Sequence, residues 1–267
     1  MSTATTQPTP EQVRATERAF YVTAFVAFLA TAGVTLWFVG TMRGGMLMPG
    51  GWTMSMMWMR MRGQGWPAAG AVFAAMWLAM MVAMMLPSTL PLLLVYRRAG
   101  IFRGDTHTGR NTWLLAAGYF AVWLAFGIVA YALGVTLAQA TMHSLALSHA
   151  IPFLAGGALV VAGIYQLTPW KAACLGHCRD PLALIANHLH GGAAGALRLG
   201  LHHGLYCTGC CWALMLMQLT VGVMSVPMMA AVAAVIAVEK LWARGPLVAR
   251  VSGVTAMVAG LGLIVVR

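Results

Sequence analysis

Long apolar runs separated by short polar segments constrain this chain more than any other feature. A helix of about 20 apolar residues crosses the hydrocarbon layer of a membrane, and hydrophobic residues make up 61% of the chain while charged residues make up 8%. Such a composition is too apolar to be buried inside a soluble domain. We therefore predict an all-α, polytopic helical membrane protein with about seven transmembrane helices, near residues 20–40, 68–96, 113–138, 151–169, 197–220, 223–241 and 246–266.

The boundary between the fifth and sixth runs leaves the number of spans open. Only Val221, Gly222 and the region up to Pro227 separate these two runs, so one long broken helix would give six spans instead of seven. The first run is too long for the apolar part of a signal peptide and is expected to remain as an anchor. We expect a disordered cytoplasmic tail at 1–19 and a single transmembrane helical domain at 20–267.

Basic residues predict the orientation of the chain. With seven spans and the N-terminus inside, 12 of the 16 lysines and arginines fall on the inner side, as the positive-inside rule requires. This orientation gives a methionine-rich outer loop at 41–67 and a Cys/His-rich inner loop at 170–204. The net charge of +11 is then an orientation signal, so the lipid bilayer is the expected partner and nucleic acid is not.

Cysteines and histidines gather in one part of the sequence. All five cysteines and five of the eight histidines fall between residues 174 and 211. Thr168 followed by Pro169 predicts the start of a short helix. Cys174 and Cys178 share a face of that helix. Cys207, Cys210 and Cys211 share a face of the fifth span in the same way, and the two faces meet if the inner loop folds back against that span.

This clustering favours a metal site over the two alternatives that the sequence leaves open. Cysteine is also a small residue that packs membrane helices closely, and Cys207 with Cys210 forms a C-x-x-C pair, as in thiol–disulfide oxidoreductases. Stable disulfides are uncommon on the reducing inner side. Thiolate and imidazole ligands suit zinc and Cu(I). The candidate ligands are Cys174, His177, Cys178, His202, His203, Cys207, Cys210 and Cys211.

Methionines favour copper over zinc. The chain has 21 methionines, and eight of them lie in the predicted outer loop at Met-x-Met and Met-x-x-Met spacings. Thioether is a soft ligand that prefers Cu(I). The alternative is an interfacial segment anchored in the lipid headgroups by Trp52, Trp58 and Trp66.

The second span continues the methionine pattern at helical spacing, and core packing is the alternative interpretation there. The predicted spans place thioethers in the outer and middle layers of the membrane and thiols toward the inner layer. This order suits a route for a soft cation across the membrane. Its candidate ligands in this span are Met80, Met81, Met84 and Met85.

Four segments resemble an uncharacterised bacterial family of predicted metal-binding integral membrane proteins: YQLTPWKAACLGHC, GLYCTGCCWALMLM, MMVAMMLPS and the pair Glu239-Lys240. The resemblance covers about residues 70–245 and implies a helical membrane protein. We expect a multi-pass protein of the bacterial inner membrane with a cytoplasmic N-terminus. The resemblance implies no agreed substrate, so copper comes from the methionines. The metal ligands that it implies are Cys174, His177, Cys178, Cys207, Cys210 and Cys211.

The expected function is Cu(I) handling, either transport or delivery to a cuproenzyme, with zinc as the alternative metal. A periplasmic copper protein or a membrane cuproenzyme is the expected partner, and the oligomeric state stays open. No P-loop, HExxH motif, nucleophile triad or paired acids appear, so no enzymatic activity is expected. A thiol oxidoreductase and a structural subunit with packed cysteines are the alternatives. Glu239 and Lys240 are expected to form an interfacial ion pair, and the alternative is that Glu239 supports the metal site from close to Cys207.

Overall fold

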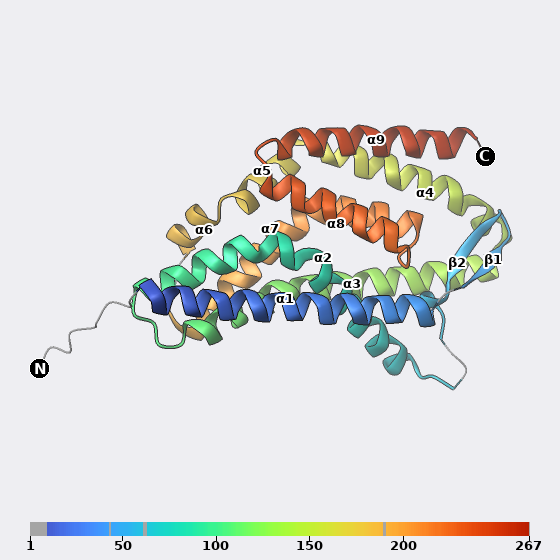
Figure 1. Ribbon diagram of the computed structural model, residues 1–267. Coiled ribbons are helices and arrows are strands. Elements are labelled where there is room, and N and C mark those ends of the chain that lie inside the picture. Colours follow the sequence, from blue (N-terminus) through green and yellow to red (C-terminus); the bar gives the residue numbers. More distant parts are fainter. Residues whose placement is uncertain (1–9, 43, 61–62, 189–190, 267) are drawn as a thin grey trace, which may run out of the picture.

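The computed structural model describes residues 10–42, 44–60, 63–188 and 191–266, and shows a bundle of long helices with a small β-hairpin at one end (Figure 1). Within the described residues, six helices are long and apolar enough to cross a membrane. The predicted all-α polytopic fold is therefore confirmed. These helices are α1 (Pro10–Thr41), α2 (Trp66–Phe102), α3 (Thr108–His143), α4 (Leu145–Gln166), α7 (Gly192–Val221) and α9 (Gly245–Val265).

The fifth and sixth predicted spans form two separate helices, α7 and α8 (Val226–Leu241). The chain turns back at Gly222, whose φ of +131° suits a residue without a Cβ, and Pro227 lies in the first turn of α8. α8 has 16 residues, which reach about 24 Å of the roughly 30 Å of hydrocarbon. The seven predicted positions thus hold six helices of spanning length and one shorter helix.

Both predicted loops and part of the predicted tail contain regular structure. α1 begins at Pro10, so the expectation of disorder is wrong for residues 10–19, while residues 1–9 lie outside the described part of the chain. The outer loop contains β1 (Gly45–Met48) and β2 (Trp52–Ser55), paired antiparallel, and the 3-10 turn η1 (Met56–Trp58). The inner loop contains α5 (Pro169–Arg179) and α6 (Pro181–His188).

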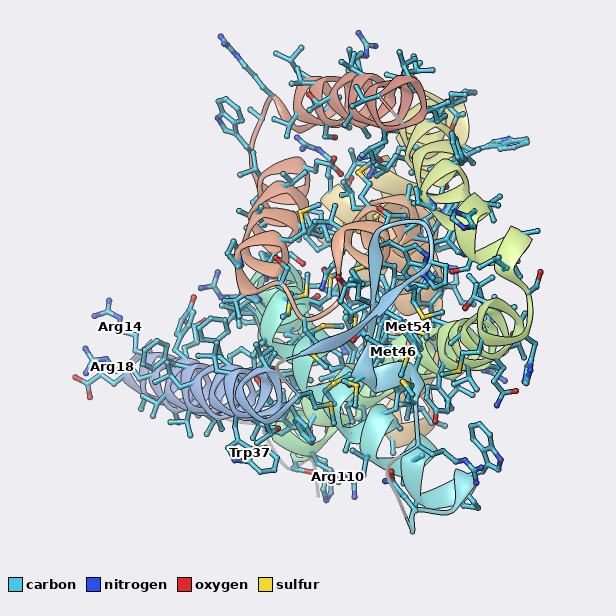
Figure 2. All side chains as sticks on the ribbon, turned by 90° about the vertical axis from the view of Figure 1, so that its right-hand side faces the viewer. Arg14, Arg18, Trp37, Met46, Met54 and Arg110 are labelled. Carbon is cyan, nitrogen blue, oxygen red and sulfur yellow. The ribbon has the colours of Figure 1, made fainter. Side chains whose placement is uncertain are left out.

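The two ends of the bundle differ in charge. The start of α1, the connection from α2 to α3, and helices α5 and α6 lie at one end, which we call the arginine-rich end (Figure 1). The hairpin and the C-terminal end of α9 lie at the opposite end, the hairpin end. Figure 2, seen from the hairpin end, shows Arg14 and Arg18 projecting away from the bundle and Met46 and Met54 on the hairpin.

Trp52 and Trp58 in the outer segment make contacts with α2, α3 and α4. The indole N–H of Trp52 donates to the carbonyl oxygen of Ser148 at 2.9 Å. The Trp58 ring lies 5.8 Å from the ring of Phe73 on α2 and 6.5 Å from that of Tyr131 on α3. These contacts fix the hairpin and η1 over the ends of α2, α3 and α4.

Glycines let α3 and α7 approach closely. A Cβ at Gly118 would lie 2.5 Å from the carbonyl oxygen of Leu197, and a Cβ at Gly200 would overlap the carbonyl of Leu115. Small residues at helix contacts allow backbones to meet in this way. The close approach brings Tyr119 of α3 against the middle of α7.

Candidate metal centre

Three cysteines of α7 form a compact thiol cluster. The sulfur atoms of Cys207, Cys210 and Cys211 all lie within 4.8 Å of one another, and the Sγ atoms of Cys210 and Cys211 are 3.2 Å apart. The three side chains are buried, and every one is a free thiol. Their i, i+3, i+4 spacing puts them on one helix face, as predicted.

The helix that carries the cluster is longer than the predicted fifth span. That span was expected at 197–220, but α7 already begins at Gly192, so the last part of the predicted inner loop is helix. Cys207 therefore lies near the middle of α7. A thiol at this depth is shielded from water on all sides.

Helix α5 brings the other two cysteines to the same place. Thr168 starts this helix by accepting a hydrogen bond from the Lys171 N–H at 3.2 Å. The Sγ of Cys178 lies 3.8 Å from the Sγ of Cys210, and Cys174 packs on Gly209, where an added Cβ would be 3.2 Å from its sulfur. The two cysteine faces thus meet, with Cys178 beside the cluster and Cys174 at its edge.

The surroundings of Cys178 favour the neutral thiol over the thiolate. A hydrogen bond with Cys207 and burial hold the pKa of Cys178 well above its usual range. Metal ligation requires a thiolate, so a cation that binds to Cys178 must displace this proton.

A lysine and a tyrosine complete the surroundings of Cys207. The Nζ of Lys240 on α8 donates to the Sγ of Cys207 at 2.9 Å and contacts the Oγ of Ser88 on α2 at 3.4 Å. The hydroxyl oxygen of Tyr119 also lies 2.9 Å from that sulfur. A buried ammonium group at this distance stabilises a thiolate. No motif or spacing in the sequence indicated Tyr119.

A buried ion pair supports the cluster from the arginine-rich end. Lys171 on α5 lies 2.6 Å from the carboxylate of Glu239 on α8, and both side chains are 1% exposed. Lys171 also donates to the carbonyl oxygen of Cys210. The other carboxylate oxygen accepts from the Gln166 amide at 3.1 Å. This network ties α4, α5, α7 and α8 together at the thiol cluster.

The predicted interfacial pair of Glu239 with Lys240 is wrong. Neighbouring residues of a helix point in different directions, so Glu239 faces Lys171 while Lys240 faces Cys207. Both are buried, and each has a different partner.

The histidines split into two groups. The His177 ring stacks on Tyr206 with centroids 3.8 Å apart, and lies 5.2 Å from the His202 ring. His203 points to the other side of α7, where its ring stacks on Tyr119 at 5.6 Å. It is 3% exposed, and its Nδ1 has no hydrogen-bond partner among the described residues. His203 therefore lies beside Tyr119, whose hydroxyl contacts the Sγ of Cys207.

The four methionines predicted on the second span all lie inside the bundle. None of the four is more than 5% exposed. The Sδ of Met80 accepts a hydrogen bond from the Gln218 amide of α7 at 3.6 Å. These thioethers therefore face other helices of the bundle and not its outer surface; they are Met80, Met81, Met84 and Met85.

The helices of membrane-spanning length and the buried thiol cluster are together typical of a polytopic membrane protein with a site for a soft metal ion. Residues 74–263 match the PpoB2 copper chaperone family, and since this match covers more than half of the chain, the protein belongs to that family. Comparisons with curated proteins and with solved structures gave no match. The predicted membership in a metal-binding family is confirmed, and copper handling follows from the family together with the thiol cluster.

Proposed function

We propose that the protein is a membrane-embedded Cu(I) chaperone that holds one ion at Cys207, Cys210 and Cys211 and delivers it to a cuproenzyme during assembly. The observation that carries this proposal is the buried group of three sulfur atoms within 4.8 Å of one another. Thiolates are the ligands that Cu(I) prefers, at low coordination number. Membership in a copper chaperone family supports the same metal.

The charges at the cluster suit a monovalent ion. With two of the three thiols ionised, one Cu(I) and the Lys240 ammonium bring the net charge to zero, which low-dielectric surroundings favour. Zinc is the alternative metal. It prefers four ligands in a tetrahedron, so Cys178 would have to move from 3.8 Å beside Cys210 into the coordination sphere.

Delivery is favoured over the other functions expected from the sequence. Thiol–disulfide exchange requires attack by an accessible thiolate, whereas Cys207 and Cys210 are both 0% exposed. The family is described as a chaperone, which supports delivery over transport. We propose no enzymatic activity.

The proposed location is the bacterial inner membrane, with the arginine-rich end and the N-terminus in the cytoplasm. The gathering of basic residues at that end supports this orientation. A periplasmic copper protein or a membrane cuproenzyme is the proposed recipient.

Metal analysis of the purified full-length protein tests the metal assignment. We expect copper to remain bound through purification in the wild type and to be lost during purification from the variant with all five cysteines changed to serine. Cys174→Ser is the matched control, because Cys174 lies at the edge of the cluster and its variant should retain copper. Equal, near-zero copper in the wild type and the five-serine variant would overturn the proposal, and zinc in place of copper would overturn the choice of metal.

Activity of a membrane cuproenzyme in cells tests delivery. We expect low activity in cells that lack this protein, recovery with the wild type, and no recovery with Cys207→Ser. Total cellular copper should stay unchanged. A change in total copper with full cuproenzyme activity would show transport instead of delivery.

A further inference from the structure

A cavity at the hairpin end is lined with methionines. It has a volume of about 180 Å³ and lies between the end of α1, the turn η1 and the start of α2. Its methionines come from three separate segments, so the fold, and not one helical repeat, gathers them. They are Met42, Met56, Met57, Met59 and Met76.

Contacts of η1 hold the cavity walls. The ring of Trp58 packs against the ring of Phe73, with centroids 5.8 Å apart, and positions η1 over α2. Met56 is 42% exposed, whereas Met57 and Met76 are 6% and 2% exposed. The thioethers therefore extend from the surface into the bundle, an arrangement that lets a cation exchange water for sulfur step by step.

A face of α2 connects this cavity with the thiol cluster. Met76, Met80 and Met84 lie on successive turns, and the next turn carries Ser88, which contacts Lys240 beside Cys207. From Met76 to Ser88 the helix rises about 18 Å.

Contacts with α7 and α8 place the two ends of this face: Met80 meets Gln218 of α7, and Ser88 meets Lys240 of α8. The Gln218 amide of α7 donates to the sulfur of Met80 at 3.6 Å, and Gln218 lies two turns from Cys211 on the same face of α7. α2 and α7 run in opposite directions. The segment of α2 from Met80 to Ser88 therefore lies beside the segment of α7 that runs back from Gln218 to Cys207.

We propose that the methionine cavity is the acquisition site for Cu(I), and that the ion passes along Met80 and Met84 to the thiol cluster. This inference rests on the proposed function of that cluster. Neutral thioethers bind Cu(I) without balancing its charge, and Arg60 at the cavity adds a like charge. The methionine cavity therefore binds Cu(I) more weakly than the thiolates of the cluster do, so transfer of the ion from the cavity to the cluster is favourable. Copper stays Cu(I) throughout, and the ligating thiols release their protons when it arrives.

A thiol-free protein isolates the acquisition site. In the variant with all five cysteines changed to serine, titration with Cu(I) against a chelator without oxygen should show one weakly bound ion. Adding Met57→Leu, Met59→Leu and Met76→Leu should lower its affinity by at least about 10-fold. Leucine conserves volume, and size-exclusion chromatography checks that the variant is folded.

The matched control changes three methionines that do not line the cavity, Met142, Met229 and Met257, to leucine in the same thiol-free protein, and it should leave affinity unchanged. No binding by the thiol-free protein, or an equal loss in the control, overturns the acquisition site. With the cysteines intact, the cavity variant should load more slowly yet reach the wild-type copper content. Failure of the proposed function looks different, because the wild type would then bind no more copper than the thiol-free protein.

Discussion

Removal of Glu239 is expected to destabilise the protein strongly. Glu239→Ala leaves the Lys171 ammonium, 1% exposed, without its carboxylate partner at 2.6 Å, and it also leaves the Gln166 amide without its acceptor. Breaking a buried pair from one side costs about 3–5 kcal/mol. Total stabilities are about 5–15 kcal/mol, so the loss should be a large fraction of the unfolding free energy.

The measurement is the unfolding free energy of the purified protein in detergent, followed by the loss of helical circular dichroism. Labelling of Cys178 by a maleimide should also become faster, because Lys171 holds α5 against α7. The double variant Lys171→Met with Glu239→Leu removes both charges and should regain most of the lost stability. Wild-type stability of Glu239→Ala would contradict this role of the ion pair, and so would a double variant that is no more stable than the single one.

Three further outcomes follow from the structure. Lys240→Met removes the ammonium group beside the thiol cluster and should weaken Cu(I) binding by roughly 10- to 100-fold in chelator competition; unchanged affinity would exclude this role. Gly200→Ala places a methyl group against a backbone carbonyl of α3 and should cost about 1–3 kcal/mol, whereas Gly157→Ala, with open space around it, should leave the melting temperature unchanged. Hydrogen bonds from a backbone N–H and an asparagine amide lower the pKa of Asp105 in the connection from α2 to α3. This contribution to stability is present above the unfolded pKa of about 3.9 and is lost as the pH falls through the lower folded value. Asp105→Asn should therefore make the melting temperature fall less steeply as the pH is lowered into the acidic range. An equally steep fall in the variant and the wild type would contradict this role of Asp105.

Periodic features of the sequence were predictable because they depend on local geometry alone. The length of each apolar run predicted the long helices, and the spacing of Cys207, Cys210 and Cys211 predicted one shared face. Thr168 and Pro169 predicted the start of α5. The boundaries were less secure, as the helical residues 10–19 and the early start of α7 show.

Pairing between distant residues was not predictable in the same way. Glu239 and Lys240 are adjacent in sequence, yet one meets Lys171 and the other meets Cys207. The methionine cavity likewise combines α1, η1 and α2, although the sequence indicated only a methionine-rich loop.

The helical bundle of membrane-spanning length, its soft ligands and the helix faces on which they lie all follow from the amino-acid sequence, because hydrophobicity and helical periodicity act over a few turns of the chain. The partners of those ligands follow only from the folded bundle: Tyr119 and Lys240 at Cys207, Cys178 beside Cys210, and separate surroundings for His202 and His203. These contacts depend on how each helix is rotated and how closely it packs. Side-chain volumes and glycines on neighbouring helices set both quantities together.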